Sequence, residues 1–264
     1  TAHDVAGGNL SARTGVSRAD ELGSLAHDLD AMAERLEDAA AEREADDERR
    51  REFFASVGHD LRSPLASMQA AVEALRDGVA TDPDRYLRSL ESDVDALHAL
   101  VDDLFLLSRI EAGDVSLGRV PTDVTDVADE AIEVLTPVAA KKHVELALDA
   151  SERVVVESAA EALSRVMRNL LDNAIRHAPE ASTVHIGIEG GNGAIVTVED
   201  EGDGFSEDFV DVAFESFTRA DASRNRDTGG SGLGLAIAKG LVEGLGGEIW
   251  AEPGPGGRVG FRLP

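Results

Sequence analysis

A histidine with polar neighbours occurs in segment 59–64, HDLRSP, on a long predicted helix. At about 100° per residue, His59 lies roughly 200° from both Val57 and Leu61, and so points away from the apolar stripe. A histidine side chain is mostly neutral at pH 7, and the lone pair of a neutral ring can attack phosphorus. Asp60 can orient or accept the second ring proton. The alternative is an ordinary exposed histidine on a helix.

A second constellation lies on a helix predicted over residues 159–177. Asn169 and Asn173 are four residues apart and therefore share one helical face. Their amide oxygens are hard ligands suited to Mg²⁺, which would bridge to phosphate groups. Arg176 and His177 follow and can supply positive charge or hydrogen-bond donors. The alternative is a pair of asparagines with no role beyond the helix surface.

An acidic, glycine-rich turn, DEGDG at 200–204, follows a strand predicted near 194–199. The Asp200 carboxylate can accept a hydrogen bond from an exocyclic amine such as the adenine 6-amino group. Gly202 and Gly204 allow the backbone to come close to such a ring. An EF-hand calcium loop is excluded because its ligand spacing and terminal glutamate are missing. A simple acidic turn remains the alternative.

A further glycine-rich segment, GGSGLGL at 229–235, leads into a helix predicted over 233–245. Free amides and the positive end of a helix dipole favour phosphate at such a position. A Rossmann fingerprint is disfavoured because a polar loop precedes the glycines, and a P-loop because no lysine follows them. The candidate phosphate-binding residues are Gly230, Gly232, Leu233 and Gly234.

The polar, irregular stretch 205–230 before this helix is long enough to act as a lid. Phe217 offers it an apolar anchor, and Arg219 offers a cation for a phosphate group. We therefore expect both residues to contribute to ligand binding when the lid closes.

Composition limits the classes of partner. The 264 residues favour about two domains. Asp and Glu number 52 against 25 Lys and Arg, a formal charge of −27 that would repel duplex nucleic acid. A polyanionic ligand therefore needs local cations or a metal. The chain has no cysteine, which excludes disulfides, a thiol nucleophile and thiolate metal sites. With no long apolar run, the given chain is expected to be soluble.

Apolar residues at alternating spacings of three and four predict long helices with partners. One such stripe runs over 54–75 and another over 87–104, with a turn near 77–83. A further stripe at 22–36 precedes a highly charged helical connector at 39–52. Since one stripe cannot bury itself, two antiparallel hairpins in a homodimer would make a four-helix bundle.

Beyond Pro121 the pattern changes to mixed α and β. Helices are predicted near 123–141, 159–177 and 233–245. Strands are predicted near 144–148, 154–156, 184–189, 194–199, 248–251 and 258–263. This order favours a two-layer α/β sandwich.

In this order the motifs resemble those of the sensor histidine kinases of two-component signalling, over nearly the whole chain. The matching segments are 59–64 (H-box), 169–173 (N-box), 200–204 (G1 box), 214–217 (F-box) and 230–234 (G2 box). The stretch from Gly8 to Met32 is similar to the later part of a HAMP module. The resemblance implies a partial HAMP module at 1–38, a linker at 39–52, a dimerisation and phosphotransfer domain at 53–116 and a Bergerat-type (GHKL) ATP-binding domain at 117–264.

The resemblance also implies protein-histidine kinase activity. His59 would accept the γ-phosphoryl group of ATP, with Asp60 as its activating base. Asn173 with Asn169 would hold Mg²⁺, Asp200 would recognise adenine, and the glycine-rich end of the lid would hold the phosphates. Ser63 retains a hydroxyl where kinases that also act as phosphatases usually have Thr or Asn, so a phosphatase activity is left open.

The implied partners are a second copy of the chain and the receiver domain of a response regulator, whose aspartate takes the phosphoryl group from His59. A HAMP module implies the cytoplasmic portion of a membrane receptor, anchored upstream of residue 1. The stimulus, the identity of the regulator and transfer within or between subunits stay open.

Two other classes of function are weighed against this one. An ATP-hydrolysing Bergerat-fold machine of the gyrase, MutL or Hsp90 type is disfavoured, because Asn169 occupies the position of their water-activating glutamate and cannot act as a base. A non-catalytic dimeric signalling scaffold is disfavoured because every expected catalytic residue type is present.

Overall fold

The computed structural model describes residues 7, 9–16, 18, 20–79, 82–115, 117–150, 152–216, 218 and 232–264. The chain divides into two compact units, residues 1–58 and 59–264. The long helix α2 (Glu21–Arg76) runs through the boundary between them. Glu21 in its first turn and Arg76 in its last turn complement the helix dipole. The helical nature predicted for the charged connector is confirmed.

In the first unit, the segment before α2 is bonded to the start of that helix. Asp30 accepts hydrogen bonds from the backbone amide and the hydroxyl of Thr14, at 2.6 and 2.7 Å. These bonds lower the pKa of the Asp30 carboxyl. Arg13 forms an ion pair with Glu37 at 2.7 Å. The apolar stripe of α2, by contrast, is exposed at Leu22, Leu25, Met32 and Leu36.

The second long helix, α3 (Pro83–Glu111), begins where Asp82 accepts the Arg85 amide and Pro83 takes the first helical position. It ends before Gly113, whose φ of +68° suits glycine. The predicted stripe of α3 is exposed at Leu87, Val94 and Val101.

A second apolar face of α3 is covered, which sequence reasoning did not predict. Leu100 and Leu107 are buried, and Ile110 packs on Gly240 of α7 (Gly234–Gly244) so closely that a Cβ there would overlap it. Asp103 on the same face forms an ion pair with Arg165 of α5 (Ala160–His177). Burial raises the pKa of Asp103, and Arg165 opposes that effect.

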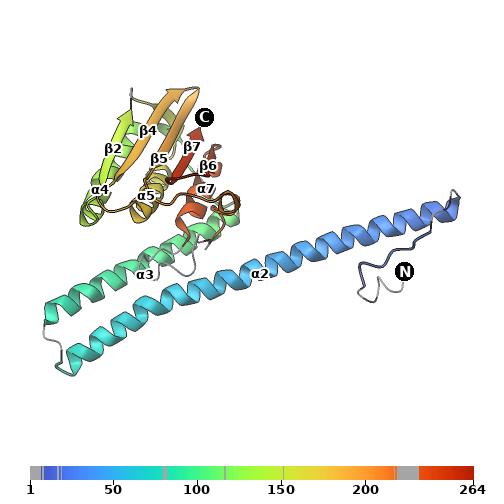
Figure 1. Ribbon diagram of the computed structural model, residues 1–264, viewed down its shortest axis with the longest axis horizontal. Helices are drawn as coiled ribbons and strands as arrows, with labels where there is room; N and C mark the ends of the chain where they lie inside the picture. Colours follow the sequence, from blue (N-terminus) through green and yellow to red (C-terminus); the bar gives the residue numbers. More distant parts are fainter. Residues whose placement is uncertain are drawn as a thin grey trace. The chain divides into compact units, whose positions relative to one another are not determined.

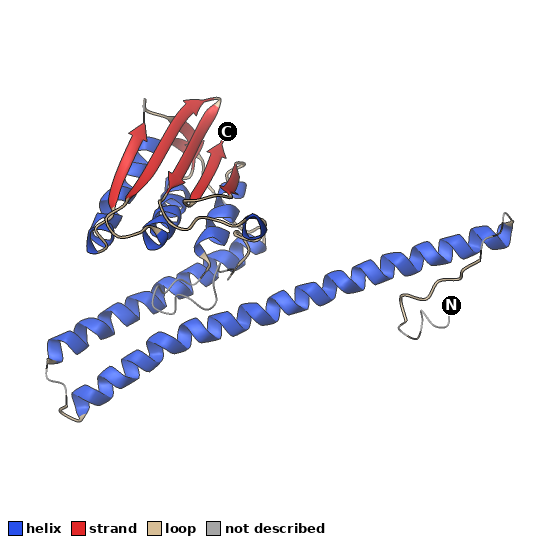
Figure 2. Cartoon of the chain, in the orientation of Figure 1, coloured by secondary structure: helices blue, strands red, loops and turns tan. Residues whose placement is uncertain are grey.

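The rest of the second unit is the predicted two-layer α/β sandwich (Figures 1 and 2). A five-stranded sheet has the order β2-β4-β5-β7-β6, with only the β2–β4 pair parallel. The remaining elements are β1 (Val120–Asp123), α4 (Val124–Lys141), β2 (Glu145–Ala150), β3 (Val155–Ser158), β4 (Thr183–Gly191), β5 (Gly193–Glu199), α6 (Glu207–Val210), β6 (Glu248–Glu252) and β7 (Arg258–Leu263).

The core lies between the sheet and helices α4, α5 and α7. Residues of β4 and β5 alternate between buried and exposed, so one face of the sheet meets the helices. Aliphatic side chains dominate the core, as the low aromatic content predicts. Its largest fully buried members include Phe261, Leu163, Met167, Ile186 and Ile237.

Two elements escaped the sequence prediction. The strand β1 pairs antiparallel with β3 but is only four residues long and contains Pro121. The stretch predicted as irregular from 205 onward begins with the one-turn helix α6. Separately, within the described residues, none of the helices has both the length and the apolar character needed to cross a bilayer.

The adjacent residues Leu135 and Val134 on α4 test this packing, since they are 9% and 54% exposed. Leu135→Ala is expected to lower the free energy of unfolding by about 2–4 kcal/mol because it leaves a cavity. Val134→Ala should change it by less than about 0.5 kcal/mol. Urea unfolding followed by the fluorescence of Trp250, the only tryptophan, measures both. Equal losses would contradict the assigned faces of α4.

Candidate functional site

The histidine motif lies on α2, in the part of that helix that belongs to the second unit. The imidazole of His59 is exposed, as the helical geometry predicted. Asp60 is half-buried beside it, and Ser63 lies exposed one turn further along. The helix continues through Pro64, which has no amide hydrogen to donate. A reactant approaching from solvent can therefore reach the ring of His59.

The Asp200 carboxylate is held between two loops at the end of β5. Its Oδ1 accepts the amide of Gly202 at 2.8 Å and the amide of Gly257 at 3.3 Å. The Asp200 amide donates to the Gly257 carbonyl at 2.8 Å, and the Gly256 amide donates to the Gly202 carbonyl at 3.0 Å. These bonds fix the carboxylate in position before any ligand arrives.

Glycine is required where these loops approach one another. A Cβ on Gly202 would lie 2.6 Å from both Asp200 Oδ1 and the carbonyl oxygen of His177. A Cβ on Gly257 would overlap the Asp200 carboxylate, and Gly204 has a φ of +75°. Sequence reasoning found Gly202 and Gly204 but missed Gly257. The repeated glycines of segment 253–257, PGPGG, were the available signal.

Burial raises the pKa of Asp200, while the two glycine amides and the charges of His177 and Lys142 oppose that rise. Burial lowers the pKa of His177, and Asp200 opposes that shift. The site therefore presents a weakly hydrated carboxylate beside a predominantly neutral imidazole at pH 7. A partly dry acceptor of this kind suits a neutral hydrogen-bond donor such as an exocyclic amine.

The two asparagines of α5 are half-buried on one face of the helix. The side-chain amide of Asn169 donates to the carbonyl of Gly234 at 3.0 Å, at the start of α7. This bond engages the nitrogen of Asn169 and leaves its oxygen for another partner. Asn173 follows one helical turn later. The amide oxygens of these residues form a donor set that fits a hard cation such as Mg²⁺.

The described part of the glycine-rich segment lies beside them. Gly232 has a φ of +67°, Leu233 is fully buried, and Gly234 begins α7. Arg176, in the last turn of α5, forms an ion pair with Asp172 at 2.6 Å. Three predicted site residues lie outside the described residues, namely Phe217, Arg219 and Gly230.

Taken together, the structure gathers most of the described candidates at three neighbouring places. These are the C-terminal half of α5, the loops after β5 and the first turn of α7, linked by the contacts of Asn169 with Gly234 and of His177 with Gly202. His59, Asp60 and Ser63 belong to a different element, α2. The arrangement can bind a ligand that has an amine-bearing ring at one end and anionic groups at the other.

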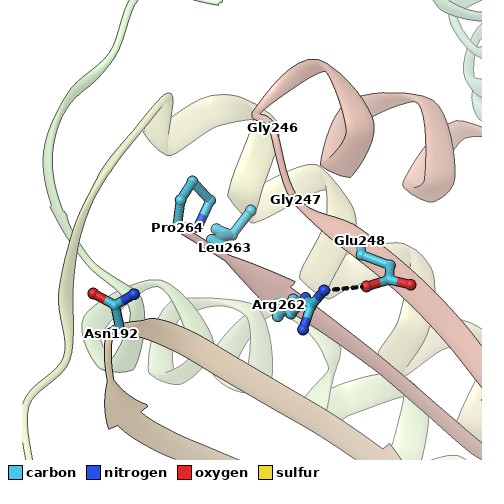
Figure 3. A pocket seen from close by; sticks show the side chains of 7 residues that line it. All are labelled: Asn192, Gly246, Gly247, Glu248, Arg262, Leu263 and Pro264. Atoms are coloured by element: carbon cyan, nitrogen blue, oxygen red, sulfur yellow. Dashed lines mark ion pairs between the residues drawn. The ribbon is translucent and has the colours of Figure 1, made fainter.

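A separate pocket of about 470 Å³ lies near the turn between β4 and β5, the start of β6 and the C-terminal end of β7 (Figure 3). It is lined by Asn192, Gly246, Gly247, Glu248, Arg262, Leu263 and Pro264. Glu248 and Arg262 form an ion pair at 2.7 Å across it. None of the predicted site residues that the structure describes lines this pocket, so it is not the candidate site.

Comparison with known families defines the class of the second unit. The model for histidine kinase-, DNA gyrase B- and HSP90-like ATPases matches residues 158–264, which contain the Asp200, asparagine and glycine groups just described. The model of the His Kinase A (phospho-acceptor) domain matches residues 49–113, which contain His59. The HAMP domain model matches residues 1–38. The fold and site thus define an ATP-binding domain of the GHKL class behind a phospho-acceptor helix pair.

Curated relatives and solved structures agree with this class. The chain is 33% identical to the signal transduction histidine-protein kinase BaeS of Escherichia coli strain K12 over 262 residues, 99% of this chain and 55% of BaeS. It is 34% identical to the sensor histidine kinase WalK of Bacillus subtilis strain 168 over 232 residues, 84% of this chain and 38% of WalK. The chain spans about half the length of the curated relatives it matches.

Among solved structures, the histidine kinase AdeS of Acinetobacter baumannii gives a TM-score of 0.64 at 26% identity, covering 78% of this chain and 96% of that one. Full-length ShkA in complex with AMPPNP gives a TM-score of 0.60 at 27% identity, and the match covers 70% of this chain and 39% of ShkA. The chain belongs to the sensor histidine kinases.

The raised pKa of Asp200 yields a pH test that needs no ligand. A carboxyl whose pKa is higher in the folded than in the unfolded protein favours folding at low pH, and that contribution is lost as the pH rises through the folded pKa. Asp200→Asn should therefore raise the melting temperature at neutral pH, and the gain should vanish in acid.

The control for this test is Asp149→Asn, which removes the same charge from an exposed position on β2. Thermal unfolding followed by Trp250 fluorescence across the acid range measures both variants. A gain for Asp200→Asn that is equal at every pH would contradict the assigned burial of this carboxylate.

Proposed function

We propose that the chain is the ATP-using portion of a sensor histidine kinase, which phosphorylates His59 and passes the phosphoryl group to an aspartate of a response regulator. The observation that carries this proposal is the pairing of two features in one chain. One is an exposed histidine on a helix matched by the phospho-acceptor model. The other is a fixed, half-buried carboxylate in a domain matched by the ATPase model.

ATP would bind with its adenine amine on Asp200. The glycines at 202, 204 and 257 permit the close approach of a flat ring, and His177 forms part of the same wall. Arg176, Gly232, Leu233 and Gly234 would serve the phosphate end, together with Phe217, Arg219 and Gly230. The ATP analogue AMPPNP in the ShkA complex supports a nucleotide as the ligand.

Asn169 and Asn173 would hold Mg²⁺ through their amide oxygens, an assignment supported by the engagement of the Asn169 nitrogen with Gly234. When bound, the ion supplies positive charge against the phosphates. The protein's own part is to position these oxygens one helical turn apart on a buried helix.

In the transfer step, a lone pair of the His59 ring attacks the γ-phosphorus of ATP. The bond from that phosphorus to the bridging oxygen breaks, and ADP leaves with the electron pair. Asp60 orients the ring and takes up its second proton. A response regulator carboxylate then attacks the same phosphorus and regenerates His59. Ser63, exposed one turn away, would orient a water molecule in a phosphatase reaction.

We place this chain in a membrane receptor, as its cytoplasmic portion. The HAMP match at residues 1–38 supports this placement, and the chain covers only part of its relatives. The signal would enter through α2, which runs without a break from Glu21 to Arg76.

We also propose a homodimer, because the stripes of α2 and α3 are apolar and exposed in one chain. Phe54, Leu65, Val72, Leu87 and Val94 are between 40% and 60% exposed. A second copy would bury them in a four-helix bundle.

Light scattering on the protein eluting from a sizing column at micromolar concentration should give twice the 27.8 kDa of one chain. A monomer would contradict the proposal. Val72→Glu places a charge on the apolar stripe and should weaken the dimer, whereas the control Ser67→Glu should not.

The central test is incubation with γ-labelled ATP and Mg²⁺. The wild type should acquire an acid-labile, base-stable label that is chased onto a receiver domain, and His59→Ala should reduce the label at least about 100-fold, since no other group replaces the nucleophile. His98→Ala, a matched change at another exposed histidine on α3, should leave it within about twofold. ATP hydrolysis without label would favour the ATPase alternative, and no nucleotide binding would favour the scaffold.

A further inference from the structure

The helix α5 ends without the usual backbone cap. The last carbonyls of any helix lack partners within it, and a left-handed residue after the end commonly satisfies them. Here Ala178 is extended, with φ −56° and ψ 139°, and Pro179 follows it. The Ala178 amide bonds to Ala174 at 2.8 Å. The carbonyls of the final turn must therefore find donors elsewhere.

Lys142 supplies those donors from another helix. Its ammonium donates to the carbonyl of Ile175 at 3.1 Å and to the carbonyl of Arg176 at 2.7 Å. A cation at a helix C-terminus also interacts favourably with the helix dipole. The half-buried side chain of Lys142 thus satisfies two carbonyls at the end of α5. Its positive charge lies at the end of the helix where the dipole favours a cation.

The turn that carries Lys142 is itself fixed. Lys142 is the C-cap of α4, and its amide bonds to Ala139 at 3.0 Å. His143 follows with a φ of +57°, uncommon for a residue with a side chain, and the Val144 amide also bonds to Ala139 at 3.0 Å. The ammonium therefore comes from a constrained turn, unlike a surface lysine that samples many rotamers.

The last turn of α5, which Lys142 caps, contains two of the predicted nucleotide-site residues. These residues are Arg176 and His177. The His177 carbonyl lies against Gly202, whose amide is one of the two that donate to Asp200. If the last turn of α5 frayed, both side chains would move and the wall beside Asp200 would loosen. The positions of Arg176 and His177 relative to the Asp200 loop therefore depend on the end of α5.

We propose that Lys142 is a positioning residue of the nucleotide site: by capping α5 from α4, it holds Arg176 and His177 in register with the Asp200 loop. This inference rests on the proposed binding of ATP. The charge of Lys142 acts on the same groups, since it lowers the pKa of both His177 and Asp200. The other charges acting on His177 are those of Asp200, Arg176 and Asp203.

The experiment compares Lys142→Met with Lys141→Met, its exposed neighbour of equal charge in the last turn of α4. Lys142→Arg restores a cationic donor, and Lys142→Gln keeps a donor without charge. Three quantities are measured on the whole chain: amide hydrogen exchange at 174–178 without nucleotide, the pKa of His177 by NMR titration without nucleotide, and the Kd for ATP with Mg²⁺.

We expect Lys142→Met to accelerate exchange at 174–178 at least about tenfold, to raise the pKa of His177, and to weaken ATP binding about tenfold. Lys141→Met and Lys142→Arg should stay within about twofold of wild type in Kd. Lys142→Gln should raise the pKa of His177 with a smaller change in amide exchange, so it separates the effect of the charge from the effect of the cap. The same variant allows the test to be made if Lys142→Met fails to fold.

Unchanged exchange in Lys142→Met would overturn the cap, and an unchanged Kd would overturn its role in the nucleotide site. A loss of affinity as large in Lys141→Met would show a general charge effect and would also overturn the inference. Failure of the wild type to bind ATP at all would instead overturn the proposed function. The exchange and titration measurements still decide the capping role in that case.

Discussion

The bonding of the Asp200 carboxylate to the amides of Gly202 and Gly257 is the constraint around which the ATPase domain is arranged. A carboxylate taken partly out of water favours its protonated form unless hydrogen bonds stabilise the charge. Two amides do so here, and each must come close enough to exclude a side chain. Strand β5 brings the aspartate, and the β6–β7 connection brings Gly257. The sheet order, with β5 beside β7, makes that meeting possible.

Helix α3 shows a second constraint, because its two apolar faces have different partners. One face, at Leu100, Leu107 and Ile110, is covered within the chain, and its Ile110 contacts Gly240 of α7. The other, at Leu87 and Val94, is exposed. The ion pair of Asp103 with Arg165 lies on the covered face and keeps a partly desolvated carboxylate matched with a cation. The same helix thus has one apolar face that is covered within the chain and a second apolar face that is exposed.

Sequence alone predicted the sandwich, because its helices and most of its strands are strongly periodic and bounded by glycine or proline. It missed β1, since four residues with a proline carry too little pattern, and it missed the covered face of α3, since a regular heptad stripe directs attention to the opposite side. His59, Asn169 and Asp200 could be selected as candidates from sequence because each has a distinctive local context. Gly257 and Lys142 have no such context, because their hydrogen-bond partners lie 57 and 33 residues away in sequence.

The acidity of the chain determines how a nucleotide can be held. With a formal charge of −27, the chain repels a polyanion at long range, so attraction must arise locally. Among the described residues near the site, Arg176 forms an ion pair with Asp172, and Lys142 donates hydrogen bonds to two carbonyls. Their charges are therefore partly compensated before a ligand arrives. The amides at the start of α7 and a divalent cation on the asparagine oxygens would supply the remaining positive potential, and nucleotide affinity would then depend on that cation and on salt.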